Sequence, residues 1–325
     1  MTEKSDALDR WTPDERFASP HGEVRWTRAG QGPPVVLMHG TPFSSHVWRE
    51  IAEALSGHYS VHLWDMPGYG RSEMREGQDV SLAAQQEVFT SLLEHWGLER
   101  PRVVAHDFGG AVALRTALLD RVAYDRLALV DAVAMRPWGS PFFRLVNRSA
   151  EVFSELPEHL HEALVRAYIA GSFHREPSAT TLDALVRPWL GEVGRAAFYR
   201  QISQADERYT AEFEPLLGEL ECPVTVLWGE EDPWLPVERG RALAEAIPQA
   251  DLRLIPGGGH LVQEDAPAPL TAALIDFLGN RLPREVNGDD RHLHRSRTGS
   301  CGVGAAEPLL FVLGSDVNPT LTFTT

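Results

Sequence analysis

The chain has 325 residues, 43% of them hydrophobic, which is enough to bury a sizeable core in one large domain or two small ones. Its formal net charge of −16 and pI of about 5.2 give an acidic surface that repels phosphate backbones and anionic lipids, so we expect neither a nucleic-acid partner nor membrane attachment. No apolar run reaches the ~20 residues that span a bilayer, and the first residues do not resemble a secretion signal. With only two cysteines, Cys222 and Cys301, no disulfide framework is expected, which fits a cytoplasmic protein.

Strand-like and helix-like segments alternate along the first part of the chain, after a polar and loose lead-in predicted over residues 1–22. Four short apolar runs are typical of buried strands, and they cover residues 35–39, 60–64, 102–106 and 126–131. Helical patterns separate them, over residues 44–55, 81–96 and 108–119. Short apolar strands between helices predict an α/β fold with a mostly parallel sheet flanked by helices.

The alternation stops at residue 132. Residues 132–215 are rich in aromatic residues and helix formers, and prolines interrupt them repeatedly. This pattern predicts a helical cap inserted between two strands of the core. An insertion at that place should cover the carboxyl ends of the strands, where open α/β sheets bind their ligands.

The strand–helix rhythm resumes after the insertion. The predicted elements are strands over 223–229 and 251–257 and helices over 237–246 and about 261–278. We therefore assign residues 23–131 and 216–283 to one α/β core. Residues 284–325 are polar and glycine-rich apart from one apolar run, and we expect a disordered tail there. A strand that pairs with a partner chain is the alternative for this tail.

A nucleophile elbow is indicated where the strand over 102–106 runs through Asp107 directly into a helix. The usual motif is G-x-S-x-G, and here Asp107 takes the serine position, between the small residues Ala105 and Gly109. Small flanking residues let the tight turn close, and the helix N-terminus favours an ionised carboxylate. The ionised form is the one that attacks carbon. The alternative role for Asp107 is a simple helix N-cap.

Two further residues complete a catalytic triad. Asp232 follows the strand over 223–229, and His260 lies in a glycine-rich loop after the last strand. The order nucleophile, acid, histidine is the one found in triads built on such an elbow. The segment His-Gly-Thr-Pro over 39–42 follows an early strand, where an oxyanion-hole loop belongs.

Residues 23–282 resemble an α/β-hydrolase of the haloalkane dehalogenase and epoxide hydrolase branch. The similarity is carried by HGTPFSSHVWR (39–49), DMPGYGRS (65–72) and AHDFGG (105–110). The elbow with its downstream aspartate and histidine is specific for this branch, whereas H-G-x-P is shared more widely among hydrolases. The resemblance implies an oxyanion hole formed by the backbone N–H groups of Thr41 and Phe108, and it implies no cofactor.

An aspartate nucleophile constrains the chemistry. Serine attack on a saturated carbon would give an ether, which histidine-activated water cannot cleave, whereas Asp107 would form an ester. Water activated by His260 can then attack the carboxyl carbon of Asp107, while Asp232 orients the imidazole. Asp131 is the alternative acid, because some relatives take theirs from the end of that strand. We favour Asp232, because GEEDPW matches the acid-bearing loop.

The leaving group is a halide or an epoxide oxygen. Haloalkane dehalogenases typically hold the halide with a tryptophan after the nucleophile and often an asparagine after His-Gly, where this chain has Phe108 and Thr41. Neither has a side-chain N–H. A haloalkane dehalogenase-like enzyme would therefore need donors from the cap, such as Trp138 or Trp189.

An epoxide hydrolase is the alternative, and it needs cap tyrosines that protonate the opening ring. The candidates are Tyr168, Tyr199 and Tyr209, and the position of Tyr199 before Asp232 favours it. Either enzyme would act on a small apolar or weakly polar organic substrate and water. A non-catalytic ligand-binding protein with a hydrolase fold is the alternative of another class. No metal cluster is indicated, and the oligomeric state stays open.

Overall fold

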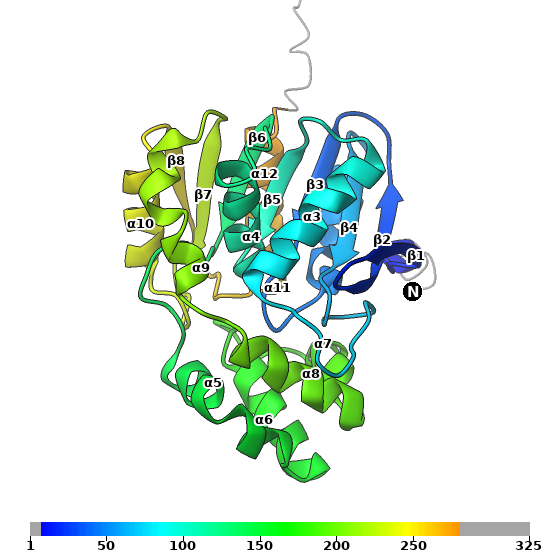
Figure 1. The fold of residues 1–325 in the computed structure, drawn as a ribbon. Coiled ribbons are helices and arrows are strands. Elements are labelled where there is room, and N and C mark those ends of the chain that lie inside the picture. The colour runs from blue at the N-terminus through cyan, green and yellow to red at the C-terminus, as the bar shows by residue number, and fades with distance from the viewer. Residues whose placement is uncertain (1–7, 280–325) are drawn as a thin grey trace, which may run out of the picture. The chain divides into compact units, whose positions relative to one another are not determined.

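The computed structural model describes residues 8–279, so the predicted tail over 284–325 lies outside the described residues (Figure 1). The described chain forms one eight-stranded sheet in the order β1-β2-β4-β3-β5-β6-β7-β8. The strands are β1 (Glu15–Ser19), β2 (Gly22–Ala29), β3 (Pro34–Met38), β4 (Ser60–Asp65), β5 (Arg102–His106), β6 (Arg126–Val130), β7 (Val224–Gly229) and β8 (Ala250–Ile255). From β4 to β8 all neighbours pair in parallel, which confirms the predicted fold class.

The central strands are buried on both faces, as their continuous apolar runs predict. In β5, Val103 pairs with Val36 of β3 on one side and with Leu127 of β6 on the other, and all three side chains are fully buried. β6 and β7 continue the same pattern. The parallel register brings the ends of β3, β5, β6 and β7 to one edge of the sheet, where the predicted site residues follow them.

Residues 15–19 form strand β1, so this part of the predicted loose lead-in is ordered. β1 and β2 make an antiparallel hairpin in which Glu15 pairs with Trp26 and Ser19 with Gly22. β2 also pairs antiparallel with β4. β1 is an edge strand with no fully buried side chain, so it carries no apolar run, and its sequence therefore gives little strand signal.

Helices cover both faces of the sheet (Figure 1). α3 (Leu82–Trp96), α4 (Phe108–Leu118) and α10 (Val237–Ala246) lie on the face toward the viewer. On the other face, α2 (Arg49–Leu55), which follows the short η1 (Ser45–Trp48), packs against α12 (Pro267–Phe277). The single helix predicted over about 261–278 is two helices, α11 (Val262–Asp265) and α12, because α12 starts anew with Pro267 in its first turn.

A helical layer separates β6 from β7 in the chain and lies over the carboxyl ends of the strands (Figure 1). Its elements are α5 (Pro141–Ser154), α6 (Glu158–Ala170), α7 (Ala179–Val186), η2 (Arg187–Trp189), α8 (Gly191–Ser203), α9 (Arg208–Ala211) and η3 (Glu214–Glu219). We call this layer the cap. Hydrogen bonds fasten it to the core: the Trp189 indole N–H donates to the carbonyl of Pro42, and the backbone N–H of His260 donates to that of Ser172.

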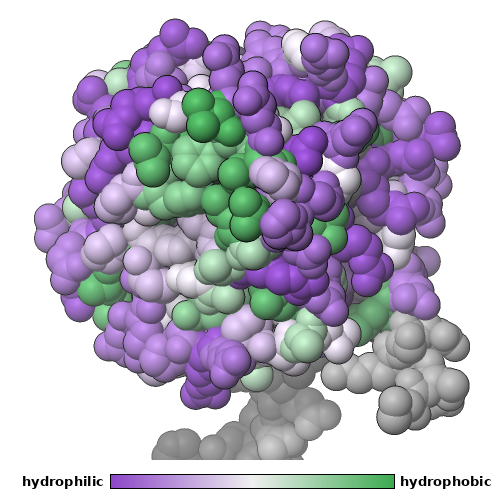
Figure 2. Space-filling view, turned by 90° about the horizontal axis from the view of Figure 1, so that it is seen from below, coloured by the Kyte–Doolittle hydropathy of each residue, from purple (hydrophilic) through white to green (hydrophobic). Residues whose placement is uncertain are grey.

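The face seen from the cap side carries a cluster of hydrophobic side chains within a largely hydrophilic surface (Figure 2). The exposed large hydrophobic residues of the described chain all belong to cap helices; they are Leu145, Val152, Leu160 and Val193. Within residues 8–279, no helix combines the length and the apolar character that a membrane crossing needs.

Candidate active site

Asp107 occupies a strained turn between β5 and α4. Its backbone has φ 50° and ψ −117°, a conformation that residues with a side chain rarely adopt. Close packing around the turn explains the glycines: a Cβ on Gly109 would lie 2.6 Å from the carbonyl oxygen of His39, and one on Gly110 would lie 2.5 Å from Cβ of Ala132. The side chain of Asp107 makes no capping hydrogen bond to α4. It is therefore free of the N-cap role and points toward other partners.

The carboxylate of Asp107 is held between a backbone amide and a histidine. Its Oδ1 accepts the N–H of Thr41 at 2.7 Å, and its Oδ2 lies 3.4 Å from Nε2 of His260. A Cβ at position 40 would lie 2.3 Å from Cβ of Asp107, which is why glycine precedes Thr41. Burial alone would raise the pKa of Asp107, but the hydrogen bond and charge of His260 and the Thr41 amide hold it below its ordinary value. The carboxylate is therefore ionised.

His260 is fixed on its other side by Asp232. Nδ1 of His260 lies 2.8 Å from Oδ2 of Asp232, whose Oδ1 accepts the backbone N–H groups of Trp234 and Leu235 at 2.7 and 2.9 Å. Burial would lower the pKa of His260, yet the carboxylates of Asp232 and Asp107 raise it well above 6.5. Both carboxylates therefore favour the protonated form of the imidazole, which lies between the two aspartates.

His106 is a site residue that the sequence did not single out. Its Nε2 lies 2.9 Å from the carbonyl oxygen of His260, so this nitrogen carries the proton and donates. Burial, and then the charge of His260, lower the pKa of His106 to about 4, so the ring stays neutral. The sequence shows that His106 precedes Asp107, but it does not show that the His106 ring contacts the loop of His260.

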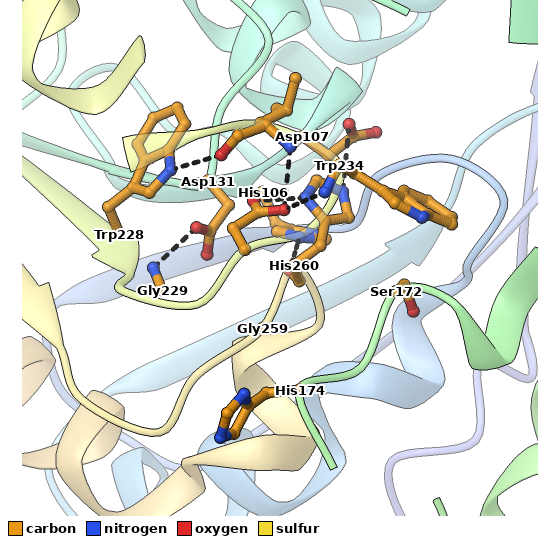
Figure 3. A network of polar contacts seen from close by, with 12 residues as sticks. His106, Asp107, Asp131, Ser172, His174, Trp228, Gly229, Trp234, Gly259 and His260 are labelled. Carbon is orange, nitrogen blue, oxygen red and sulfur yellow. Dashed lines mark hydrogen bonds and ion pairs between the residues drawn. The ribbon is translucent and has the colours of Figure 1, made fainter. Parts of the chain in front are cut away.

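Asp131 follows β6 and is also fully buried, but it does not contact His260 through a hydrogen bond. Its Oδ1 accepts the N–H of Gly229 at 2.8 Å, and the carboxylate turns toward that residue in Figure 3. Its Oδ2 has no donor among the described residues. Burial, and then the nearby carboxylate of Asp232, raise the pKa of Asp131 well above its ordinary value. Asp232 is thus the aspartate that the fold brings to Nδ1 of His260.

A small cavity of about 30 Å³ opens beside these groups. Residues from the elbow, the cap and two core loops line it; they are Thr41, Asp107, Phe108, Val133, Trp138, Gly139, Ser140, Phe143, Tyr168, Trp234, Leu235 and His260. Of the predicted cap candidates, Trp138 and Tyr168 are on this wall, and Trp189, Tyr199 and Tyr209 are not.

The indole N–H groups proposed as halide donors are both engaged elsewhere. Trp138 donates from Nε1 to Oγ1 of Thr210 at 2.9 Å, and Trp189 donates to the carbonyl of Pro42 at 2.8 Å. Neither indole is therefore free to hold a leaving halide without breaking a buried hydrogen bond.

Two of the three cap tyrosines point away from the cavity. The hydroxyl of Tyr199 lies 2.9 Å from Nδ1 of His161 inside the cap, and the hydroxyl of Tyr209 accepts from Arg208. Tyr168 instead borders the cavity, close enough for the Asp107 charge to act on it. Burial, and then that charge, raise the pKa of Tyr168 far above its ordinary value, against a hydrogen bond with Ser140 on the same cavity wall, so the side chain remains a phenol.

Trp234 is a second residue that the sequence left unassigned. Its ring lies 4.9 Å from the His260 ring and stacks on Tyr168 at 4.6 Å. Its indole Nε1 is directed toward the cap, since a Cβ on Gly171 would lie 4.0 Å from it. The signal available in the sequence was its place two residues after Asp232, in the loop that carries the acid.

The loop that carries Thr41 is tied to the cap by a buried amide. The hydroxyls of Thr41 and Tyr69 both donate to Oε1 of Gln201 in α8. This bond holds Thr41, and so its backbone N–H, against Asp107. No cluster of His, Cys, Asp or Glu suited to a metal ion occurs in residues 8–279.

Known proteins that are similar to this chain include α/β-hydrolases and enzymes that share their fold. Residues 33–267 match the model of a family described as the alpha/beta hydrolase fold. An α/β-hydrolase fold protein from Burkholderia ambifaria is 45% identical, with a TM-score of 0.78 over 81% of this chain and 97% of its own. Haloalkane dehalogenase 2 of Mycobacterium tuberculosis is 28% identical over 81% of this chain and 94% of its own. A thermophilic esterase from Thermogutta terrifontis is 25% identical, with a TM-score of 0.68 over 81% of this chain and 98% of its own.

Proposed function

The chain belongs to the α/β-hydrolase family, and on that premise we propose that it hydrolyses a small organic substrate at a saturated carbon with Asp107 as the nucleophile. One observation carries this proposal: the ionised Asp107 carboxylate stands at the elbow, between the Thr41 amide and His260, in a cavity lined mainly by apolar side chains. A carboxylate in that position can attack carbon and form an ester.

We infer that the bond broken in the first step is the C–O bond of an epoxide. Tyr168 is on the cavity wall as a phenol, whereas the indoles of Trp138 and Trp189 are both committed to other acceptors. Asp107 attacks one ring carbon, the C–O bond opens, and the Tyr168 hydroxyl gives its proton to the oxygen. The resulting phenolate takes a proton from the imidazolium of His260, which leaves a neutral imidazole.

The second step hydrolyses the ester. Neutral His260 takes a proton from water, and the hydroxide attacks the carboxyl carbon of Asp107. The tetrahedral oxyanion is stabilised by the backbone N–H of Thr41 and by that of Phe108 at the start of α4. The ester C–O bond then breaks, the alkoxide takes the proton from His260, and the carboxylic acid of Asp107 returns its own proton to His260. One epoxide and one water thus give one diol.

Dehalogenation is the second candidate, and a specific pair of observations favours it. Haloalkane dehalogenase 2 is similar over nearly its whole length, and Trp234, which has an indole N–H, lines the cavity. In that reaction the same ester forms, and a halide leaves in place of the epoxide oxygen. We favour epoxide opening because the indoles of Trp138 and Trp189, the two donors expected for a halide, are both bonded to other acceptors.

A substrate screen tests both. Purified protein is incubated with small terminal epoxides and with small chloro- and bromoalkanes, and diol and halide are measured. We expect diol, with the oxygen of ¹⁸O-labelled water entering Asp107 during repeated turnover, because water attacks the carboxyl carbon. Halide release without any diol would replace the first candidate by the second. Saturable binding of these compounds without any product would indicate a non-catalytic ligand-binding protein.

A further inference from the structure

A second, much larger space lies directly outside the small cavity. It is a groove of about 690 Å³ between α5 and the segment from Ser203 to Tyr209 at the end of α8. Among residues 8–279, only Trp138 and Phe143 border both the groove and the cavity that holds Asp107. These two rings therefore form the partition between the two spaces.

Of the two rings of the partition, Trp138 is fixed by hydrogen bonds and Phe143 is held by apolar contacts alone. The backbone N–H of Trp138 donates to Glu207 and its indole to Thr210, both at 2.9 Å. Phe143 meets the rings of Phe108 and Trp138 edge to face, with centroids 6.2 and 6.1 Å away, and no polar bond restrains its side chain. Rotation of Phe143 is consequently the least costly way to join the spaces.

The inner cavity limits what can react there. Its volume of about 30 Å³ accommodates roughly two water-sized groups, so it is close to the size of an epoxide ring and little more. The remainder of any larger substrate must therefore lie outside the cavity. The groove on the other side of Phe143 has the space to hold it.

The groove favours an uncharged but hydrogen-bonding chain. Arginines and carboxylates both line it; they are Arg144, Arg208, Asp79, Asp206 and Glu207. An anionic group would meet the three carboxylates, and an alkyl chain would desolvate polar groups without pairing them. Arg144 donates to the carbonyl of Gly139 and makes no ion pair among the described residues, so its remaining N–H groups can reach a neutral acceptor.

We propose that the groove binds the tail of the substrate, that Phe143 is the gate through which the tail passes, and that the substrate is a terminal epoxide with an uncharged chain of ether or hydroxyl oxygens. This assignment rests on the proposed function, since it names the substrate class of the same site. Phe143 and the groove then determine specificity, while Asp107, His260 and Tyr168 perform the chemistry.

The test compares three probes on the full-length protein: propylene oxide, a terminal alkyl epoxide, and a glycidyl ether of equal length with an oligoether tail. We expect the oligoether epoxide to have the highest kcat/KM. Ser203→Trp fills the groove from its rim and should lower that value at least about tenfold, the effect of losing roughly one good contact, while leaving propylene oxide unchanged. Ser154→Trp is the matched control, because both serines donate to the carbonyl three residues earlier and Ser154 borders neither space.

A binding measurement separates this proposal from the proposed function. The diol with the oligoether tail is titrated into wild-type protein and into the Ser203→Trp variant by calorimetry, which needs no turnover. Binding that the variant loses supports the groove even if no epoxide reacts. Turnover of propylene oxide with no preference for the oligoether epoxide, or a Ser203→Trp variant equal to wild type with every probe, would overturn the groove assignment and leave the proposed function intact.

Discussion

Replacing Asp131 by asparagine should make the protein more stable at neutral pH. Asp131 is fully buried, and burial together with the Asp232 carboxylate raises its pKa in the folded state. The folded protein therefore holds a proton on this group that the unfolded chain releases above about pH 3.9. Stability is lost as the pH rises from there toward the folded pKa, by up to about 1.4 kcal/mol per pH unit.

The asparagine variant removes this loss with little change in shape. Its Oδ1 can still accept the Gly229 amide, its Nδ2 can donate to Asp232 in place of the carboxyl proton of Asp131, and asparagine tolerates the φ of 40° at this position. Between pH 5 and pH 7 its advantage over wild type should grow by roughly 1 to 3 kcal/mol.

Urea unfolding at several pH values between 5 and 8 measures this difference, and Glu230→Gln, an exposed carboxylate after β7, serves as the control. The control should track wild type at every pH. A variant at Asp131 that is no more stable than wild type at pH 8, or whose advantage stays constant with pH, would refute the reasoning.

Three further predictions concern catalysis. Asp107→Asn should abolish turnover of any substrate found in the screen while the circular dichroism stays that of wild type; more than a trace of remaining activity would exclude Asp107 as the nucleophile. His260→Gln should still form the ester but not hydrolyse it, so intact-mass spectrometry should find the substrate mass added to the protein, and a free protein after substrate exposure would contradict the two-step scheme. Tyr168→Phe should raise the barrier to epoxide opening by roughly 1–3 kcal/mol, whereas Tyr199→Phe should leave kcat within about twofold; the reverse pattern would return the acid role to Tyr199.

The sequence predicts the core of the fold and the meeting of the triad for the same reason. The strands that precede Asp107 and Asp232 are buried apolar runs, the strand before the His260 loop alternates polar and apolar residues, and parallel strands bring their carboxyl ends to one edge. Residues that directly follow these strands in the chain are therefore expected to lie close together at that edge. The edge strand β1 is not predicted because its exposed residues form no apolar run. The break between α11 and α12 is not predicted either, because Pro267 is compatible with the first turn of a helix as well as with a break.

The sequence predicts that the cap is helical, but it does not predict which cap side chains point into the cavity. Tyr168 and Tyr199 are both aromatic residues on amphipathic helices, and their sequence positions do not say which one borders the cavity. Which tyrosine borders the cavity depends on how the helices pack. Tyr199 hydrogen-bonds to His161 within the cap, whereas Tyr168 stacks on Trp234 beside His260. The same limit applies to the indoles, since the acceptors of Trp138 and Trp189 lie 72 and 147 residues away in the chain.

The charges around His260 explain how one imidazole can serve both steps of the proposed reaction. In the resting site two carboxylates, those of Asp107 and Asp232, hold the pKa of His260 well above 6.5, so the ring is an acid. Once Asp107 has become an ester, its negative charge and its interaction with Nε2 are gone, and the pKa must fall because burial now opposes a single carboxylate. The proton leaves for the phenolate of Tyr168, and the neutral ring becomes the base that water needs. Hydrolysis restores the Asp107 carboxylate and with it the protonated resting state.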